Sequence, residues 1–257
     1  VNKILNKNKI LAPKLINQNY KNNYIEVEDF GDNTLFKVLK HNKTNKELFF
    51  RKILKTLSRL QLIKDKQVVN LNRQKYKVQK YDNKILLNEA KLFSEWYATR
   101  KINKFKIRKF KKVFENEVKK LLSKLNFKND TFVHRDFHVS NLMYVKNNIA
   151  VIDSQDALIG NKAYDLASLV DDVRFETSNK LKNKILNNYF KKLKKTEINK
   201  FVNDFEILSV LRNLKIIGIF MRLALRDNKK KYVKMIPYAW EMINYRMKKN
   251  REFVNLK

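Results

Sequence analysis

One stretch of 26 residues decides how this chain folds. Residues 131–156 read TFVHRDFHVSNLMYVKNNIAVIDSQD, with apolar runs on either side of short polar segments. The apolar runs 142–145 and 149–152 flank an Asn-containing turn at 146–148, which predicts a short β-hairpin. The apolar pair 132–133 predicts another short strand before the polar loop.

The polar loop carries a pattern typical of kinase-type phosphoryl transfer. His134, Asp136 and Asn141 fit H-x-D-x-x-x-x-N, and Asp153 follows the hairpin. Asn141 and Asp153 stand equally far along the chain from Asn147 at the expected tip, so strand pairing should bring them together at the open end. Their amide and carboxylate oxygens could share one Mg²⁺ with nucleotide phosphates. Asp136 would orient an incoming hydroxyl and accept its proton.

Each of these side chains also has a plain structural alternative. Asp136 and Asn141 could cap the loop, and Asp153 could end a strand. The four specified residues rarely occur together at these spacings by chance, so the joint pattern favours chemistry. We assign His134 to structure, where it holds the loop through hydrogen bonds, whereas His138 suits loop packing and substrate contact equally.

Composition limits the class of protein and the kinds of site. The chain has 257 residues, of which 44% are hydrophobic and 12% aromatic, with three His and no Cys. This composition indicates a globular protein, long enough for one large domain or two lobes that share a cleft. The absence of Cys excludes disulfide frameworks, thiol catalysis and Cys/His zinc sites, so any metal must bind oxygen ligands.

A net charge of +33 raises nucleic acid or an anionic membrane as possible partners. The cations are mostly Lys and are spread evenly along the chain, whereas nucleic-acid surfaces use Arg for bidentate contacts. We therefore expect no specific nucleic-acid partner. No stretch approaches the roughly 18 apolar residues of a membrane span, and the first residues lack the apolar core of a signal peptide. We expect no membrane partner and a cytoplasmic location.

Outside this stretch, apolar periodicity predicts mostly helices. An opening helix is expected over residues 1–11 and should end before Pro13. Helix starts are expected at a capping box over 44–47 and at the caps Asp82, Ser178 and Thr196, and a break is expected at Pro237. Apolar residues at helical spacing follow in 48–62, 86–97, 113–125 and from 163 onward. One alternating segment, 24–28, predicts a strand that Gly31 closes.

Three blocks of the sequence resemble the aminoglycoside phosphotransferase and choline kinase superfamily. The blocks are FVHRDFHVSNLM (132–143), VIDSQDALIG (151–160) and AYDLASLVDD (163–172). Within that superfamily the chain is most similar to bacterial cell-wall amino-sugar kinases, which phosphorylate N-acetylmuramate and N-acetylglucosamine at the anomeric hydroxyl. The similarity extends through 24–34, 85–97 and 216–237.

The resemblance implies an α+β, protein-kinase-like fold, with an incomplete N-terminal lobe over residues 1–30 and a mostly helical C-terminal lobe over 31–257. It implies ATP and Mg²⁺ as cofactors and a small hydroxylated metabolite, an amino sugar, as acceptor. The strands that precede the first helix in the family are missing, so we expect an N-terminally truncated chain. The alternatives are an aminoglycoside, choline or other small-alcohol kinase, a catalytically silent fragment, or a basic binding protein.

The resemblance also implies residue roles in the loop and hairpin. Asp136 matches the catalytic base, Asn141 and Asp153 match the Mg²⁺ ligands, and Asp165 matches a buried acid that braces the catalytic loop. Ser154 departs from the family pattern, which has Phe there, so hydrophobic anchoring of the metal loop should be weaker.

Further implied roles lie outside the hairpin. They are an adenine-binding hinge, Val27, Glu28 and Asp29, and a sugar-binding face, Glu89, Glu95 and Trp96. The helical spacing of the second set suits packing and an exposed surface equally well. The pair Asp171-Asp172 replaces an Arg-Asp pair of the family at a position that contacts substrate.

Overall fold

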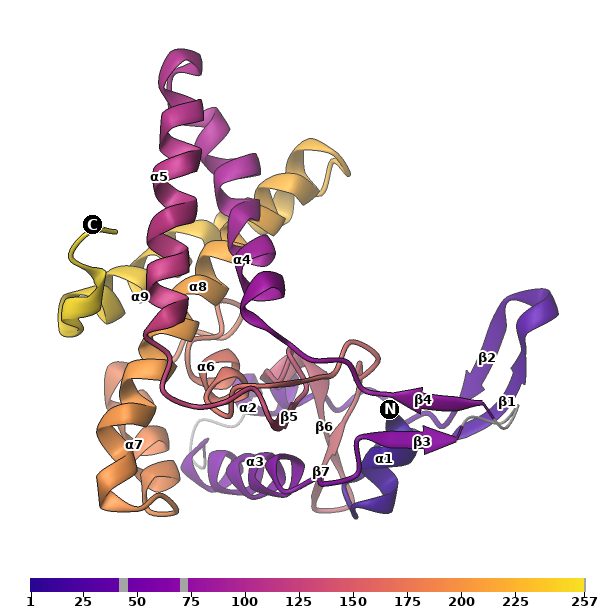
Figure 1. Cartoon of the computed structure of the whole chain (residues 1–257). Coiled ribbons are helices and arrows are strands. Elements are labelled where there is room, and N and C mark those ends of the chain that lie inside the picture. Colours follow the sequence, from indigo (N-terminus) through magenta and orange to yellow (C-terminus); the bar gives the residue numbers. More distant parts are fainter. Residues whose placement is uncertain (42–45, 70–73, 257) are drawn as a thin grey trace. The chain divides into compact units, whose positions relative to one another are not determined.

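The computed structural model describes residues 1–41, 46–69 and 74–256 (Figure 1). The chain forms two compact units, each with its own packed interior. The first unit comprises Val1–Lys80, Asn129–Val170 and Thr177–Leu193, and the second comprises Tyr81–Lys128, Asp171–Glu176 and Lys194–Lys257. These units are defined by packing and not by nucleotide binding, so a lobe boundary near residue 30 stays a prediction.

The first unit mixes helices with short strands. Its helices are α1 (Asn2–Lys7), α2 (Leu35–His41), α3 (Lys46–Gln61), α6 (Tyr164–Val170) and α7 (Asn179–Phe190), with 3₁₀ turns η1 (Tyr20–Asn22) and η4 (Val139–Asn141). Its strands are β1 (Leu15–Asn19), β2 (Tyr24–Val27), β3 (Gln67–Val69), β4 (Lys75–Lys77), β5 (Thr131–Val133), β6 (Leu142–Val145), β7 (Asn148–Val151) and β8 (Leu158–Gly160). They pair antiparallel as β1–β2, β3–β4, β5–β8 and β6–β7.

The β6–β7 hairpin forms as expected and has a tight turn. Its register runs from Leu142 opposite Val151 to Val145 opposite Asn148. The turn therefore consists of the two residues at 146–147, with φ of 43° and 67°. Positive φ at both central residues is the type I′ geometry that matches the twist of the flanking strands.

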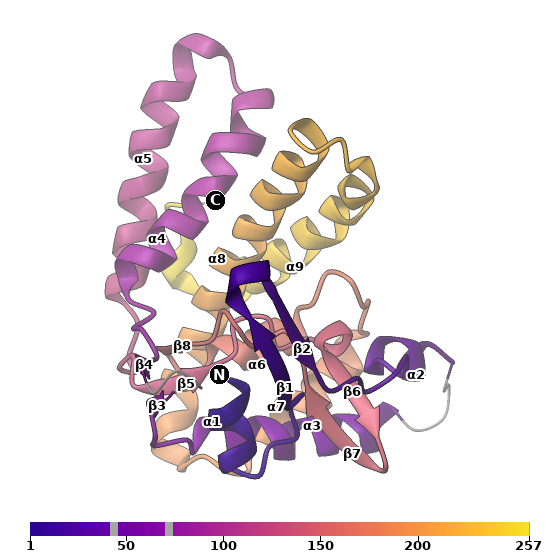
Figure 2. The same ribbon diagram turned by 90° about the vertical axis from the view of Figure 1, so that its right-hand side faces the viewer.

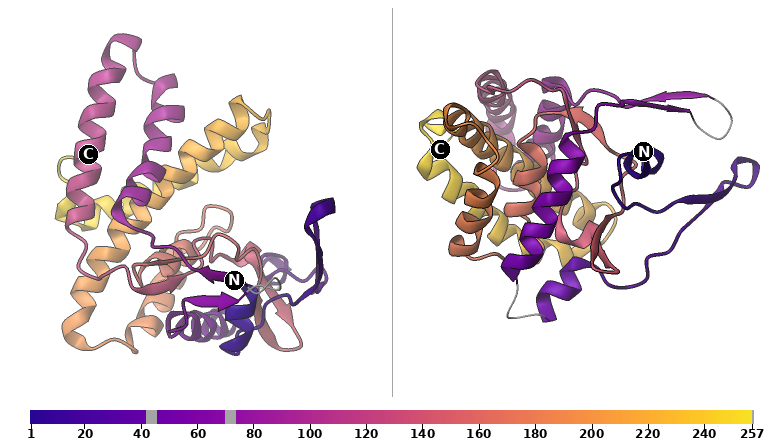
Figure 3. Two further views of the ribbon diagram at one scale, coloured as in Figure 1. Left: turned by 45° about the vertical axis from the view of Figure 1, so that its right-hand side comes forward. Right: turned by 90° about the horizontal axis from the view of Figure 1, so that it is seen from below.

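The hairpin is held in the first unit by helices on both of its strands. α2 contacts β6 and α3 contacts β7 (Figure 2). α3 is amphipathic and buries one face, which comprises Phe49, Phe50, Ile53, Leu54, Leu57 and Leu60. By contrast, β1 and β2 stand away from the helices of their unit, and every residue of β2 is exposed (Figure 3).

In the second unit, the described residues outside loops are all helical. The elements are α4 (Asn83–Leu92), a π-helical turn η2 (Phe93–Tyr97), 3₁₀ turns η3 (Ala98–Arg100), η5 (Lys230–Met235) and η6 (Arg251–Phe253), and the long helices α5 (Lys104–Ser123), α8 (Lys195–Leu225) and α9 (Ile236–Lys249). α8 packs against α4, η2 and α9. A Cβ on Gly218 of α8 would lie 2.3 Å from the backbone carbonyl carbon of Leu92, so only glycine permits this close approach.

Several helix boundaries agree with local signals in the sequence. Asp82 caps α4 by accepting the backbone N–H of Ile85 at 2.9 Å, and Ser178 caps α7 by accepting that of Leu181 at 3.3 Å. Pro237 stands in the first turn of α9, where its missing N–H costs no helical hydrogen bond.

Other boundary predictions are wrong or lie outside the described residues. Thr196 does not cap α8, because the helix already begins at Lys195. The opening helix ends at Lys7 and not near Leu11, because Lys9 adopts a left-handed φ of 56°. The sequence does not predict strand β1, because its residues LINQN do not alternate between apolar and polar side chains. The capping box over 44–47 falls largely outside the described residues.

No helix in the described ranges combines the length and apolar character needed to cross a membrane.

Candidate active site

The loop between β5 and β6 is anchored in the interior of the first unit. Phe137 and Val139 are 0% and 1% exposed, and they alternate with polar positions along the loop. Asp136 and Asn141 are partly exposed. The two apolar side chains hold the loop against the core, whereas Asp136 and Asn141 stay at its surface.

Asp165 holds this loop through two hydrogen bonds. It stands in the first turn of α6 and is 1% exposed. Its carboxylate accepts the backbone N–H of His134 at 2.7 Å and that of Arg135 at 3.0 Å. Arg135 has a φ of 74°, which is costly for a residue with a side chain and persists only where its surroundings hold it. The two charge-assisted hydrogen bonds from Asp165 supply that hold.

His134 ties the loop to the end of β7. Its ring is fully buried, and Nε2 lies 2.9 Å from the carbonyl oxygen of Ile152. A carbonyl only accepts, so Nε2 carries the hydrogen. Burial lowers the pKa of His134, so the imidazole is neutral at pH 7. These contacts agree with the structural role that the sequence suggests for this histidine.

Asn141 and Asp153 come together at the open end of the hairpin. Asn141 Nδ2 donates to Asp153 Oδ2 at 3.4 Å, so the two side chains are adjacent and could reach one cation. The sequence argument placed the turn centre at Asn147, but the register is centred between residues 146 and 147. Ile152 is thus the residue paired with Asn141, through an N–H···O bond of 3.1 Å. Asp153 reaches the same place because its own φ of 60° bends the chain back.

The donor set at this point fits Mg²⁺. Asn141 Nδ2 also donates to the carbonyl oxygen of Asp136 at 3.1 Å, so the amide oxygen is the atom that could ligate a cation. Asp153 is exposed and its carboxylate accepts Gln155 Nε2 at 2.6 Å. Mg²⁺ typically takes one or two protein oxygens and completes its shell with phosphates and water. In the described part of the chain, no group of three or more acidic or histidine side chains forms an alternative metal site.

The segment that carries Asp153 is anchored by polar contacts. Ser154 is 3% exposed, and its hydroxyl donates to the side-chain oxygen of Asn2 in α1. Arg135 Nη1 donates to the carbonyl oxygen of Asp156 at 3.2 Å. A hydrogen bond to α1 therefore occupies the position where the family has an apolar anchor.

The remaining predicted residues of the first unit lie in the catalytic-type loop and at the end of β2. His138 is 4% exposed, and its carbonyl oxygen accepts the N–H of Asn141 at 2.9 Å, so its backbone shapes the turn. Val27 ends β2 and Glu28 donates its N–H to the carbonyl oxygen of Lys14. Asp29 accepts the N–H of Gly31 at 2.8 Å.

The segment after Asp29 is joined to the hairpin by backbone hydrogen bonding. Tyr144 of β6 donates its N–H to the carbonyl oxygen of Asn33 at 2.9 Å, and Thr34 bridges to Met143. The predicted adenine-binding segment is therefore followed, within five residues, by backbone contacts to β6, the strand that begins after Asn141.

The three predicted sugar-binding residues belong to the second unit. Glu89 accepts the Tyr81 hydroxyl and forms a largely buried ion pair of 2.9 Å with Lys215. Glu95 is exposed and Trp96 is partly exposed on the η2 turn. Their role toward a sugar stays a prediction.

Sequence reasoning missed the network around Asp171. This carboxylate is fully buried and accepts Arg246 Nε at 2.8 Å, Arg246 Nη2 at 3.1 Å and the Ser209 hydroxyl at 2.6 Å. The departure at Asp171 from the family's Arg was the available signal, since an Asp in an apolar helix block needs a buried partner.

Comparison with known proteins agrees with this geometry. The fold and the loop define a kinase-like phosphotransferase, and a model of the "Phosphotransferase enzyme family" matches residues 4–197. The chain belongs to that family.

Individual proteins extend the similarity over most of the chain. An N-acetylmuramate/N-acetylglucosamine kinase of Neisseria meningitidis is 34% identical over 68% of this chain and 54% of its own length. A kinase of the same name from Pseudomonas aeruginosa is 27% identical over 95% of this chain and 71% of its own length. An ADP-bound aminoglycoside phosphotransferase has a similar fold, with a TM-score of 0.56 and 19% identity over 94% of this chain and 80% of its own.

The similar segment thus spans about half of the Neisseria kinase.

Proposed function

We propose that this chain takes part in ATP- and Mg²⁺-dependent phosphorylation of a small metabolite, at the anomeric hydroxyl of a cell-wall amino sugar. One observation carries the proposal: Asn141 is hydrogen-bonded both to the backbone of Asp136 and to the carboxylate of Asp153, so the three residues lie together. A base and two cation ligands are the protein groups that phosphoryl transfer to a hydroxyl requires.

Asp136 is the group that handles the proton. It is partly exposed on a loop whose backbone is held by Asp165. Its carboxylate orients the acceptor hydroxyl and takes the proton as the hydroxyl oxygen bonds to the γ-phosphorus and ADP leaves. A loop fixed by two hydrogen bonds presents the base without further ordering, which is how positioning lowers a barrier.

Asn141 and Asp153 are the groups that would hold Mg²⁺. When bound, the cation would neutralise phosphate charge that builds up during transfer. Asp153 supplies the negative charge, and Asn141 supplies a neutral amide oxygen. Gln155 orients the Asp153 carboxylate by donating to its other oxygen.

The nucleotide and the acceptor sugar are assigned to two further groups of residues. For adenine, Val27, Glu28 and Asp29 offer an extended backbone on a segment that continues to the β6 strand. For the acceptor, support comes from the two related N-acetylmuramate/N-acetylglucosamine kinases, which together match most of the chain. Glu95 and Trp96 are the accessible candidates for contacts with the sugar, whereas Glu89 is engaged with Lys215.

A phosphate-transfer assay tests the proposal. ATP labelled on its γ-phosphate is incubated with N-acetylmuramate, N-acetylglucosamine, an aminoglycoside and choline, using this chain and the longest product of its gene. We expect labelled sugar 1-phosphate from the two amino sugars. Labelling of the aminoglycoside or choline instead would replace the substrate assignment and keep the phosphotransferase.

Two substitutions separate the base from the metal ligand. Asp136→Asn should lower kcat by about 10²–10⁴ and leave Mg·ATP affinity nearly unchanged, because Asp136 meets only the acceptor. Asp153→Asn should weaken Mg·ATP binding and turnover together. Asp156→Asn, an exposed carboxylate in the same segment, serves as the matched control and should change neither. Equal loss of nucleotide affinity in both test variants would show that these roles are misassigned.

A further inference from the structure

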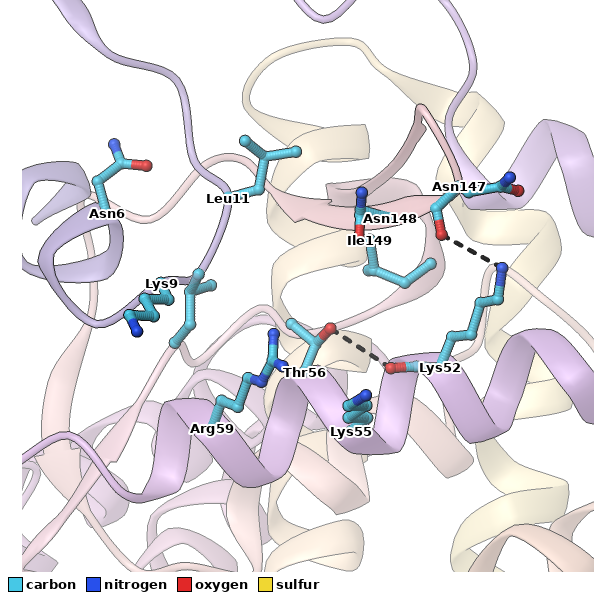
Figure 4. A pocket seen from close by; sticks show the side chains of 11 residues that line it. Asn6, Lys9, Leu11, Lys52, Lys55, Thr56, Arg59, Asn147, Asn148 and Ile149 are labelled. Carbon is cyan, nitrogen blue, oxygen red and sulfur yellow. Dashed lines mark hydrogen bonds between the residues drawn. The ribbon is translucent and has the colours of Figure 1, made fainter.

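A cavity of about 440 Å³ lies at the other end of the β6–β7 hairpin (Figure 4). One wall is α3, and the others are the hairpin turn and the segment that follows α1. Its volume falls in the range of small-molecule sites, about 300–1,000 Å³. Asn141 lies six residues from the turn residue Asn147, roughly 20 Å along an extended strand. The near edge of the cavity, at Leu11, accepts the N–H of Val151, but none of the three predicted phosphoryl-transfer residues lines the cavity. The cavity is therefore distinct from the phosphoryl-transfer site.

The lining of this cavity is strongly basic. It includes Lys9, Lys52, Lys55 and Arg59, and no acidic residue is among the residues that line it. The last three stand on one face of α3, because positions i, i+3 and i+7 of a helix align. Figure 4 shows Lys52 and Arg59 rising from α3 toward the hairpin.

Cations just outside the cavity have acidic partners. Lys7 of α1 forms an ion pair of 2.6 Å with Asp65. Arg51 of α3 forms an ion pair of 2.9 Å with Glu47. These two cations are thus neutralised, whereas Lys3 of α1 donates to the carbonyl oxygen of Val69.

Inside the cavity, such neutralisation is missing. Within the ranges that the structure describes, Lys9, Lys55 and Arg59 have no ion-pair partner. Lys52 donates to the carbonyl oxygen of Asn147 at 3.2 Å, which uses one of the three hydrogens of its ammonium group. Converging positive charge without a counter-charge is an electrostatic site for an anion.

The rest of the lining limits the kind of anion. Ile10 and Ile149 are 2% and 6% exposed, and they give the cavity an apolar floor. Asn6, Thr56 and Asn148 already donate to backbone carbonyl groups, so the cations are the main donors left to contact a ligand. A concave site with an apolar floor suits a compact ligand better than the extended backbone of a nucleic acid, which follows a groove.

We propose that this cavity binds a small, multiply charged phosphorylated metabolite, separately from the catalytic loop. The planar guanidinium of Arg59 can hold two phosphate oxygens at once, while Lys9, Lys52 and Lys55 act as point charges around it. The inference stands on the cavity alone and does not depend on the phosphoryl-transfer reaction.

Calorimetry with inorganic pyrophosphate tests the proposal. The titration is done with the full chain at physiological salt and with EDTA, which prevents binding that needs Mg²⁺ at Asn141 and Asp153. We expect saturable binding at one site. The double variant Lys55→Ala/Arg59→Ala should weaken the affinity by about tenfold or more, as expected for the loss of one charge-assisted hydrogen bond.

A matched variant controls for general surface charge. Lys104→Ala/Arg108→Ala removes the same two residue types at the same helical spacing from exposed positions of α5. Its affinity should stay within about twofold of the parent, because neither residue lines the cavity. Lys55 and Arg59 are themselves exposed, so their replacement should leave the fold intact, as circular dichroism would verify.

Four results would overturn the proposal. These are no saturable binding, an equal loss of affinity in both double variants, a loss of pyrophosphate binding in Asp153→Asn, and tighter binding of an oligonucleotide that depends on Lys55 and Arg59. The third result would place the probe at the transfer site, and the fourth would make the cavity part of a nucleic-acid surface. Because the titration needs no turnover, its outcome is independent of whether the kinase assay succeeds.

Discussion

The two units each bury an aspartate near α6, and the two carboxylates have different partners. In the first unit Asp165 accepts backbone N–H groups of the loop that carries Asp136. In the second unit Asp171 accepts the guanidinium of Arg246 on α9 and the hydroxyl of Ser209 on α8. The residues stand six positions apart and are both almost fully buried.

The difference shows how one residue type serves two purposes. Asp165 accepts two neutral backbone N–H groups of the loop that presents Asp136, so its replacement should disturb the geometry of that loop first. Asp171 neutralises a buried cation: burial acts to lower the pKa of Arg246, but the charge of Asp171, with a smaller effect from Glu206, raises it above its usual value. Removing Asp171 strands that cation in the interior, so its replacement should disturb stability first.

The largest expected effect is that of Asp171→Ala. Leaving Arg246 buried without its partner should lower the free energy of unfolding by about 3–5 kcal/mol. Urea denaturation followed by tryptophan fluorescence measures this directly, because Trp96 and Trp240 both belong to the second unit. Asp227→Ala removes a partly exposed partner of the exposed Arg226 and is the control. If the two variants lose the same stability, the buried pair is not what holds α8 and α9 together.

Gly218→Ala should also act on the second unit. The new methyl group would meet the carbonyl carbon and oxygen of Leu92 at 2.3 Å and 2.5 Å, and α8 must shift away at a cost of about 1–3 kcal/mol. Gly31→Ala in the first unit is the comparison, since nothing lies within 4 Å and only the φ of 72° opposes the change. A smaller shift in the denaturation midpoint for Gly218→Ala than for Gly31→Ala would contradict the close approach.

Asp165→Asn should act on the loop of the first unit. An amide NH₂ would face one of the two backbone donors, which leaves that N–H unsatisfied at a cost of about 1–3 kcal/mol. Hydrogen exchange at the amides of His134 and Arg135 should speed up, while the tryptophan-detected transition of the second unit stays in place. Unchanged exchange at both amides would show that Asp165 does not hold the loop. Asp156→Asn serves as the control.

The smallest effect expected is a pH dependence caused by His134. Burial lowers its pKa in the folded state, so on acidification the unfolded chain binds the proton first. The stability from the neutral ring is complete above the unfolded pKa of about 6.5 and is lost as the pH falls toward the folded pKa, by up to about 1.4 kcal/mol per pH unit. Urea unfolding at a series of pH values from neutral downward measures the slope, and His134→Asn should flatten it. A parent protein of constant stability below pH 6.5 would show that the ring is not held neutral.

Much of the site could be predicted because its determinants are local. The hairpin follows from apolar runs around a two-residue turn, and Asn141 and Asp153 are joined by that hairpin. Even here the turn centre was misplaced by half a residue, and the left-handed φ of Asp153 compensated for it. A pattern of residue types cannot reveal such a dihedral angle, because it depends on the contacts that hold Asp153.

The sequence by itself determined the hairpin, the loop pattern around Asp136 and caps such as Asp82, since each depends on residues within one turn or one strand pair. Only the tertiary structure decided that Asp165 reaches a loop 31 positions back, that Asp171 pairs with Arg246 75 positions on, and that unpaired cations converge on one cavity. The physical reason is the separation along the chain over which each interaction acts. Periodicity and turn chemistry act between near neighbours, whereas a buried charge finds its partner only after distant segments have packed.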